Sequence, residues 1–269
     1  MRSSGRRPTV RVIVGGAATK RPDTLATEEP LEIRVGRRPL AVTMRTPGDE
    51  LDLALGFLVT EGVIGAPDDV VTAILCGDDG FNVVEVTLAA HVPPPDASVE
   101  RNFYTTSSCG VCGKASIDAI RTRSRFDLAA DAVSVEPSVI IALPDRLRAA
   151  QRTFDRTGGL HAAGLFTSAG ELVVVREDVG RHNAVDKVVG WALQAGLLPL
   201  TGHLLMVSGR ASFELTQKAW MAGIPLLAAV SAPSTLAVDL AVEAGMTLAG
   251  FVRGDTFNLY AHPHRVHLP

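Results

Sequence analysis

The segment LLMVSGRASFELTQKAWMAGIPLLAAV, residues 204–230, decides the fold class of this chain. It opens with an apolar run of strand length, passes through a turn of Ser, Gly and Arg, continues in a helical pattern over 213–221, and ends in a second apolar run over 226–230. Strands that are apolar on both faces and alternate with helices are typical of a parallel sheet covered by helices on both sides. The segment therefore predicts an α/β domain.

The same alternation continues on either side of this segment. Further strands are predicted at 165–166, 172–175 and 247–252, and further helices at 144–157, 183–193 and 236–243. The prediction is an α/β domain over residues 136–269, built on a mostly parallel sheet.

The first hundred residues show a different pattern, with hairpins around a single helix. Strands are predicted at 32–35 and 41–44 for one hairpin and at 71–76 and 82–88 for the other, with a helix from Thr46-Pro47 to Gly62 between them. We predict three further units: a flexible or loosely strand-like tail over 1–27, a small α+β domain over 28–100, and a dithiol loop with a connecting helix over 101–135.

The composition excludes several classes of protein. With 269 residues, 46% of them hydrophobic, the chain can bury one large core or two modest ones. A net charge of −3 argues against non-specific nucleic-acid binding. Three cysteines, an odd number, argue against a secreted disulfide framework and indicate a reducing compartment, the cytoplasm. Gly and Pro interrupt the uncharged stretch 188–207, and Arg11 splits the apolar part of the N-terminus, so no membrane span or signal peptide is expected.

A pair of cysteines, Cys109 and Cys112, lies in the sequence TTSSCGVCGK, residues 105–114. This spacing serves half of a zinc site, a redox disulfide, or a nucleophilic thiolate that carries a group on sulfur. Zinc would need two further Cys or His ligands at similar spacing, and the sequence lacks them. Lys114 and the start of a helical pattern behind it favour the thiolate. We predict no metal site, with a zinc-binding interaction module and a structural turn as alternatives.

Four junctions of the α/β region are rich in Gly, Ser and charge: 177–183, 208–212, 231–234 and 253–256. Small residues let backbone N–H groups approach an anion, and helix N-termini favour negative charge. We predict a site for a large phosphorylated ligand at these junctions. Its candidate contacts are Arg181, His182, Ser208, Arg210 and Arg253, with a binding role for His182, while Glu177, Asp178 and Asp186 could be ordinary polar partners.

Several longer motifs, in a fixed order, resemble the formate dehydrogenase accessory proteins (FdhD), which are sulfurtransferases of molybdenum cofactor maturation. The resemblance runs from about Glu28 to Tyr260. Its motifs are TPGD at 46–49, ALGF at 54–57, CGVCG at 109–113, GLHAA at 159–163, EDVGRH at 177–182 and GF at 250–251. The resemblance implies that the C-terminal domain is a cytidine deaminase-like α/β/α sandwich that lacks the deaminase zinc ligands.

The resemblance also implies a sulfur relay. A cysteine desulfurase would load Cys109 with persulfide sulfur, and Cys112 would resolve or relay it. The acceptor would be the molybdenum bis(molybdopterin guanine dinucleotide) of the formate dehydrogenase catalytic subunit, held as a bound substrate, with no permanent cofactor. The family's cofactor-binding stretch corresponds to Phe251, Val252, Arg253, Gly254, Asp255 and Thr256.

The resemblance further implies a homodimer, and neither nucleic acid nor a membrane is expected as a partner. A chaperone that binds the cofactor without transferring sulfur is the alternative function.

Overall fold

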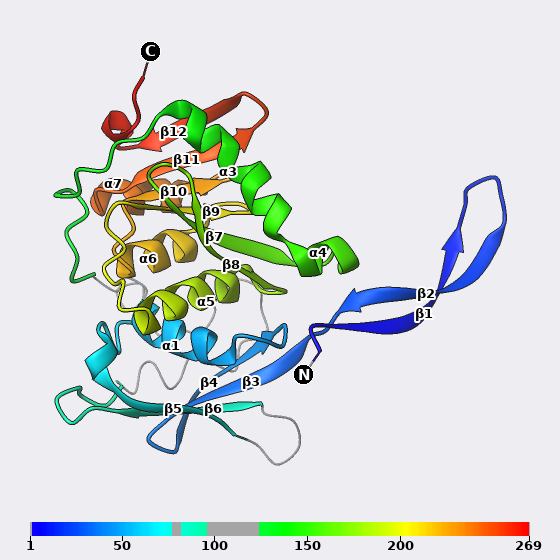
Figure 1. The fold of residues 1–269 in the computed structure, drawn as a ribbon, viewed down its shortest axis with the longest axis horizontal. Coiled ribbons are helices and arrows are strands. Elements are labelled where there is room, and N and C mark those ends of the chain that lie inside the picture. Colours follow the sequence, from blue (N-terminus) through cyan, green and yellow to red (C-terminus); the bar gives the residue numbers. More distant parts are fainter. Residues whose placement is uncertain (1, 77–81, 96–123, 269) are drawn as a thin grey trace.

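The computed structural model describes residues 2–76, 82–95 and 124–268 (Figure 1). At its centre lies a six-stranded sheet in the order β12-β11-β10-β9-β7-β8. The strand bounds are β7 His161–Thr167, β8 Leu172–Asp178, β9 His203–Val207, β10 Leu226–Ala229, β11 Thr247–Arg253 and β12 Thr256–Ala261. The alternation seen in the sequence therefore does produce an α/β domain.

The sheet is mixed, which corrects the prediction of a mostly parallel one. β10 pairs in parallel with β9 and with β11, whereas β7 pairs antiparallel with both β8 and β9, and β12 pairs antiparallel with β11. Parallel neighbours need a long crossover, and only the strands separated by a helix have one. The short turns at 168–170 and 254–255 force antiparallel pairing at the two ends of the sheet.

Helices cover both faces of this sheet. Along β9, Leu205 and Val207 pack into one core, whereas Leu204 and Met206 pack into a second core on the opposite face. The first core lies under three helices, α5 Arg181–Gln194, α6 Phe213–Met221 and α7 Thr235–Glu243, and the second lies under α3 Pro137–Ala150. The sandwich therefore has the three layers α, β and α.

The helix predicted over 144–157 is wrong at its start and in its continuity. The structure contains two helices here, α3 and then α4 Arg152–Thr157, separated at Gln151, where ψ is 73°. α3 begins at Pro137, because proline suits the first helical position, and Pro144 lies inside the helix rather than at its start.

The smaller N-terminal unit has the predicted hairpins and helix. Its four-stranded sheet has the order β4-β3-β6-β5, with α1 Glu50–Thr60 on one face. The bounds are β3 Glu29–Val35, β4 Arg38–Arg45, β5 Val70–Cys76 and β6 Val83–Leu88, with the short helix η1 Pro67–Asp69 before β5. Alternate residues of β3 and β6, among them Leu31, Ile33, Val84 and Val86, are fully buried in the core shared with α1.

Helices α1 and α5 join the two units by a contact of backbone against backbone. A Cβ added to Gly56 would lie 1.7 Å from the carbonyl oxygen of Asp186, and a Cβ added to Gly190 would lie 1.8 Å from that of Asp52. Only glycine allows this approach at both positions. One hydrophobic core runs from the four-stranded sheet through both helices to the six-stranded sheet. The two units therefore pack as one body, stacked in layers (Figure 1).

The N-terminal residues form a hairpin, which corrects the expected flexible tail. β1 Ser4–Val12 pairs antiparallel with β2 Ala18–Ala26 over nine residues of each strand. Figure 1 shows this hairpin, here called the arm (residues 4–26), reaching away from the rest of the molecule. The strand-like alternative was the correct one, because Val10, Val12 and the neighbouring threonines suit an extended, paired backbone.

Candidate functional site

The carboxyl ends of β9, β10 and β11 meet at one edge of the six-stranded sheet. The backbone N–H of Ser231 donates to the carbonyl of Gly209 over 3.2 Å, and the N–H of Phe251 donates to the carbonyl of Ser231 over 3.2 Å. Because β7 is antiparallel to β9, its first residue, His161, lies at the same edge, beside Gly209. β8 also ends here, and α5 begins. We call residues 161, 181–182, 208–212, 230–234 and 250–251 the carboxyl edge.

The loop after β9 contributes three polar side chains with different roles. Ser208 closes the sheet, because its hydroxyl accepts the N–H of Ala162 over 2.9 Å. Arg210 is exposed. Ser212 is the N-cap of α6, yet its buried hydroxyl has no hydrogen-bond partner among the described residues, and it does not cap the helix. A buried hydroxyl without a partner is costly. Ser208 thus has a structural role, while Ser212 and Arg210 have groups available to a ligand.

The first turn of α5 brings Arg181 and His182 to this edge. Burial and the neighbouring Lys218, Arg181, His161 and Arg210 lower the pKa of His182 from 6.5 to about 3. His182 Nε2 lies 3.8 Å from a carboxylate oxygen of Glu214 and has no hydrogen-bond partner within the described ranges. The ring is therefore neutral at pH 7, and this contact is not an ion pair at that pH.

His161 responds to the same surroundings. Burial and the charge of Arg181 lower the pKa of His161, against the opposing effect of Asp178. Burial is the main cause of both lowered pKa values, and nearby cationic side chains, among them Arg181, lower them further. Those cations give this edge a positive potential. Such a potential attracts an anion, and the N-termini of α5 and α6 add to it.

Asp178, at the end of β8, holds the loop that leads into α5. Its Oδ1 accepts the N–H of Gly180 over 2.8 Å and an amide N–H of Asn183 over 3.0 Å. Its Oδ2 accepts the N–H of Thr46 over 3.1 Å and pairs with Lys187 over 2.8 Å. Both charged side chains are essentially unexposed. Asp178 is thus an internal polar partner, one of the alternatives that the sequence left open.

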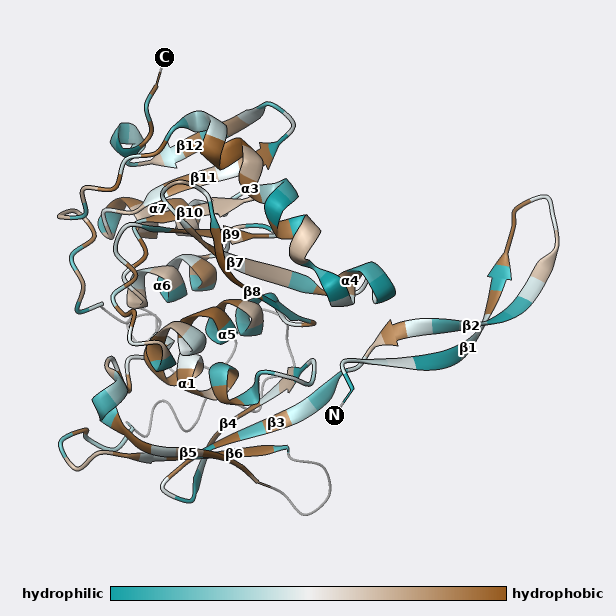
Figure 2. Cartoon of the chain, viewed as in Figure 1, coloured by the Kyte–Doolittle hydropathy of each residue, from teal (hydrophilic) through white to brown (hydrophobic). Residues whose placement is uncertain are grey.

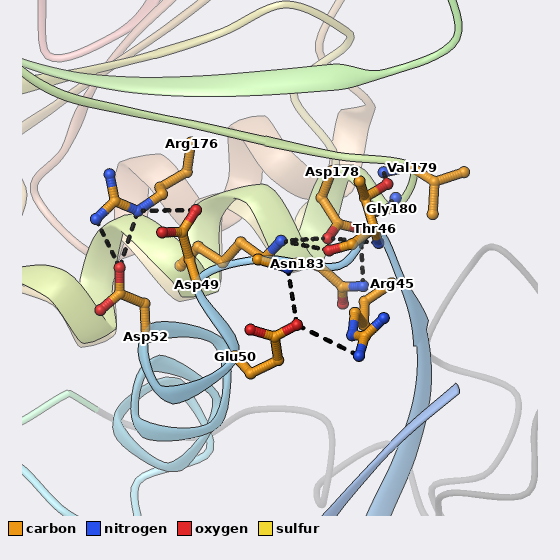
Figure 3. Close-up of polar contacts among 12 residues, drawn as sticks. Arg45, Thr46, Asp49, Glu50, Asp52, Arg176, Asp178, Val179, Gly180 and Asn183 are labelled. Atoms are coloured by element: carbon orange, nitrogen blue, oxygen red, sulfur yellow. Dashed lines mark hydrogen bonds and ion pairs between the residues drawn. The ribbon is translucent and has the colours of Figure 1, made fainter. Parts of the chain in front are cut away.

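The other half of this network comes from the loop between β4 and α1 (Figure 3). The hydroxyl of Thr46 accepts the N–H of Val179 over 3.1 Å, and Lys187 donates to the carbonyl of Thr46 over 2.9 Å. Asn183 donates to the carbonyl of Met44 over 2.8 Å. Two sequence motifs that lie more than a hundred residues apart therefore bind each other.

Further ion pairs extend this contact between the two units. Arg176 pairs with Asp52 over 2.6 Å, and on α5 and α6 the buried Asp186 and Lys218 pair over 2.8 Å, where Thr60 also donates to Asp186. We call the contact of α1 and residues 44–49 with residues 176–180, residues 183–194 of α5 and Lys218 of α6 the seam. Thr46, Lys187 and Lys218 were missed as site-supporting residues, although a lysine inside the apolar run of α5 was a visible signal.

Glu177 also has a structural partner. Its two carboxylate oxygens accept the N–H groups of Thr153 and Phe154, over 2.8 and 2.7 Å, in the first turn of α4. The EDVGRH motif therefore divides into two parts. Glu177 and Asp178 hold the fold, and Arg181 and His182 face the carboxyl edge.

The stretch 251–256 contains the predicted junction 253–256, which is not a junction between a strand and a helix. It is the end of β11, a tight turn, and the start of β12, so no helix N-terminus lies there. Val252 is fully buried under α3 and is not available to a ligand, whereas Arg253, Gly254, Asp255 and Thr256 are exposed.

Phe251 has φ +54° at a break in the β11–β12 register. A bulky residue in the left-handed region is unusual, and such outliers gather at functional sites. Phe251 is thus the member of this stretch that the geometry ties to the carboxyl edge. Arg253 lies 5.4 Å from the centre of its ring.

The predicted catalytic residues, Cys109 and Cys112, lie outside the described residues. In the parts of the chain that the structure describes, no group of three or more His, Cys, Asp or Glu side chains could hold a metal ion. Within the same ranges, no helix combines the length and apolar character that crossing a membrane requires.

Fold and site together define a class of protein: an α/β/α sandwich joined to a small α+β unit, with arginine and histidine side chains at the edge where α5 and α6 begin. The chain belongs to the FdhD/NarQ family, whose model matches residues 26–267.

Similar proteins cover nearly the whole chain. The sulfur carrier protein FdhD of Streptomyces avermitilis is 61% identical and covers 99% of this chain and 97% of its own length. The protein of the same name from Sulfolobus acidocaldarius is 44% identical, with 98% and 99% covered. A solved structure, described as a putative formate dehydrogenase accessory protein from Desulfotalea psychrophila, has a TM-score of 0.77 at 23% identity and covers 98% of this chain and 100% of that one. This last likeness concerns the fold alone.

Proposed function

We propose that this chain is a sulfur carrier that takes sulfane sulfur onto Cys109 from a cysteine desulfurase and delivers it to the molybdenum cofactor of formate dehydrogenase. The observation that carries the proposal is the family match over residues 26–267, together with relatives named sulfur carrier protein. The sequence supplies the group that this chemistry needs, a Cys109–Cys112 pair flanked by glycine.

Loading is a thiol exchange reaction. The Cys109 thiolate attacks the terminal sulfur of the donor persulfide, the new S–S bond forms on Cys109, and the desulfurase cysteine leaves as a thiolate. No external oxidant or reductant is consumed. The rate depends on the thiolate fraction of Cys109 and on access to it.

Delivery requires two electrons, because sulfane sulfur becomes sulfide when it binds the metal. Cys112 can provide them. Its thiolate attacks the inner sulfur of the Cys109 persulfide, a Cys109–Cys112 disulfide forms, and hydrosulfide leaves toward the metal. A cellular dithiol then reduces the disulfide for the next cycle. This gives Cys112 the resolving role.

The carboxyl edge is the proposed place for the phosphates of the guanine dinucleotide. Arg210 and Arg181 provide charge, and His182 and Ser212 provide polar atoms without a partner among the described side chains. Phosphate groups suit this set, because two helix N-termini also point their N–H groups there. The cofactor is a substrate in this scheme, docked while sulfur reaches its metal. The nearby Arg253 and Phe251 would contact its outer part.

The decisive test is direct detection of sulfur on the carrier. The protein is incubated with a cysteine desulfurase and cysteine, and intact mass and peptide mapping follow. We expect an added mass of one sulfur on the Cys109 peptide. The variant Cys109→Ala should lose the label, whereas Cys76→Ala, which removes the half-buried free thiol of β5, should keep it. Absence of label with intact cofactor binding would instead indicate a cofactor chaperone.

The remaining expectations complete the proposal. The partners are the desulfurase and the catalytic subunit of formate dehydrogenase, the chain acts as a homodimer, and the reaction takes place in the cytoplasm. The odd cysteine count and the need for a reduced dithiol support a reducing compartment. Cross-linking and sedimentation of the purified chain with each partner would test these assignments.

A further inference from the structure

The arm has a composition unlike the rest of the molecule. Residues 1–27 contain six basic residues and one acidic residue, a net charge of +5. The whole chain carries −3, so the remaining residues carry −8. The family match begins at residue 26, at the end of β2, so the arm lies outside the part matched by the family model.

The tip of the arm is apolar and exposed. Residues 12–18, Val-Ile-Val-Gly-Gly-Ala-Ala, contain no polar side chain. Val12, Ile13 and Val14 are 69%, 56% and 99% exposed, and Val10 is 52% exposed. The tip is the part of the arm most distant from the body (Figures 1 and 2). Three adjacent branched side chains presented to water at a projecting end indicate a surface that another molecule covers.

Basic side chains surround the stem below this tip. Arg6 and Arg7 are neighbours on β1, and Lys20 and Arg21 are neighbours on β2, so within each pair the side chains point to opposite faces of the hairpin. All four are exposed, as is Arg11 beside the tip. Positive charge therefore lies on both faces of the ribbon. A partner that covered a single face of the ribbon would contact only half of these basic side chains.

The outer edges of the arm are unsuited to pairing with another strand. Pro8 and Pro22 are directly opposite each other in an unbroken ladder. A proline lacks the N–H that a ladder needs, so it is tolerated where that position faces outward. Each outer edge is thus interrupted near its middle, which protects it from strand addition. What remains for binding is the end of the arm.

Contrary to the expectation that no membrane is a partner, we propose that the arm docks end-on to an anionic lipid surface, with residues 12–14 entering the interface and the basic stem meeting the head groups. An apolar tip with positive charge on all sides fits a planar, negatively charged, partly apolar surface. The base of the arm is held against α4, where Arg156 donates to the hydroxyl of Ser3 over 3.5 Å, and the tip points away from the body (Figure 1).

Vesicle sedimentation with the full-length chain tests the proposal. We expect the protein to pellet with vesicles of equal parts phosphatidylcholine and phosphatidylglycerol and not with phosphatidylcholine alone. The stem variant Arg6→Gln, Arg7→Gln, Lys20→Gln, Arg21→Gln should bind about 100-fold more weakly, because each basic residue near such a surface contributes severalfold. The tip variant Val12→Ser, Ile13→Ser, Val14→Ser should bind about 10-fold more weakly.

Matched controls and competing partners make the outcome decisive. Val71→Ser with Ile74→Ser removes two exposed apolar residues of β5, 63% and 54% exposed, and should leave binding unchanged. No binding to anionic vesicles would overturn the proposal. Full retention of vesicle binding in the tip variant would also overturn it. Tighter binding to duplex DNA, lost only in the stem variant, would show that the arm binds nucleic acid instead. A change from dimer to monomer in the tip variant would show that a second copy covers the tip.

Discussion

The seam and the carboxyl edge share helix α5 but differ in how their polar groups are satisfied. At the seam, Asp178 and Lys187 are fully buried and have charged or backbone partners for their functional atoms. At the edge, the hydroxyl of Ser212 and Nε2 of His182 have no partner in the described part of the chain. Satisfied and unsatisfied polar groups therefore lie within the first two turns of the same helix.

This difference shows how to divide a motif into structural and binding residues. Proximity in sequence does not decide it, because Asp178 and His182 are four residues apart. What separates the two kinds of residue is whether the polar atoms of the side chain have hydrogen-bond or charged partners within the protein. Residues whose polar groups have partners should act on stability, whereas Ser212 and His182, which lack partners among the described residues, should act on ligand affinity.

Substitution of Asp178 should have the largest effect on the free energy of unfolding. Asp178→Ala leaves the buried ammonium of Lys187 without its counter-charge and removes the acceptor for Thr46 and Gly180. We expect a loss of about 3–5 kcal/mol in the free energy of unfolding, measured by urea denaturation. Asp145→Ala, at an exposed position of α3, should change it by less than about 0.5 kcal/mol. A cost below about 1 kcal/mol for Asp178→Ala would contradict the structural role.

Substitution of a glycine where α1 contacts α5 should have the next largest effect on the free energy of unfolding. Helix propensity alone predicts that Gly190→Ala stabilises by about 1 kcal/mol. The added Cβ would lie 1.8 Å from the Asp52 carbonyl oxygen, so the helices must move apart. We expect a net loss of about 3 kcal/mol in denaturant melts. Gly159→Ala, where the nearest atoms are 3.8 Å away, is the control and should be nearly neutral. A stabilised Gly190→Ala protein would show that the helices do not meet this closely.

The pH dependence of stability reports the burial of His182 among cationic side chains at the edge. The pKa of His182 is about 3 in the folded protein and 6.5 in the reference state, so the unfolded chain binds this proton first. Stability therefore falls as the pH drops below about 6.5, by about 2 kcal/mol on reaching pH 5. His182→Gln should lose this part of the dependence, as followed by thermal melts at each pH. The same slope in both proteins would contradict the assignment.

The smallest effect comes from two serines that occupy the same helix position. Ser234 caps α7, because its hydroxyl accepts the N–H of Ala237 over 3.2 Å, whereas Ser212 makes no such bond at α6. Ser234→Ala should cost about 1 kcal/mol. Ser212→Ala should be close to neutral without ligand, because no hydrogen bond among the described residues is lost. If differential calorimetry showed the same loss of stability for Ser234→Ala and Ser212→Ala, the hydroxyl of Ser212 would be contributing as much as the cap of α7, which would contradict this account.

Periodic, local features of the fold could be predicted from the sequence, and features set by long-range contact could not. Both hairpins of the small unit and helices α1, α5, α6 and α7 follow from apolar spacing and turn residues. The direction of β7 and the pairing of β12 depend on neighbours that spacing does not reveal. The arm was missed because its strands pair with each other rather than with an apolar core.

In the candidate site too, local features could be predicted from the sequence and long-range contacts could not. Charge and glycine content identified Arg181, His182 and Arg210 as neighbours of a strand end, and the structure brings them together at the carboxyl edge. Nothing local indicated that Thr46 would bind Asp178 from the other unit, since that contact exists only after α1 packs on α5. The buried position of Val252 likewise depends on α3 covering that face of the sheet.

Titration of the protein with guanosine diphosphate in a calorimeter tests the central claim, that the carboxyl edge binds phosphate groups. The account predicts that Arg210→Gln weakens binding at least about 10-fold, since one charged contact to phosphate is lost. Arg152→Gln, which removes an exposed arginine at the start of α4, should bind like the unchanged protein. Equal affinity in the Arg210→Gln variant would contradict the account.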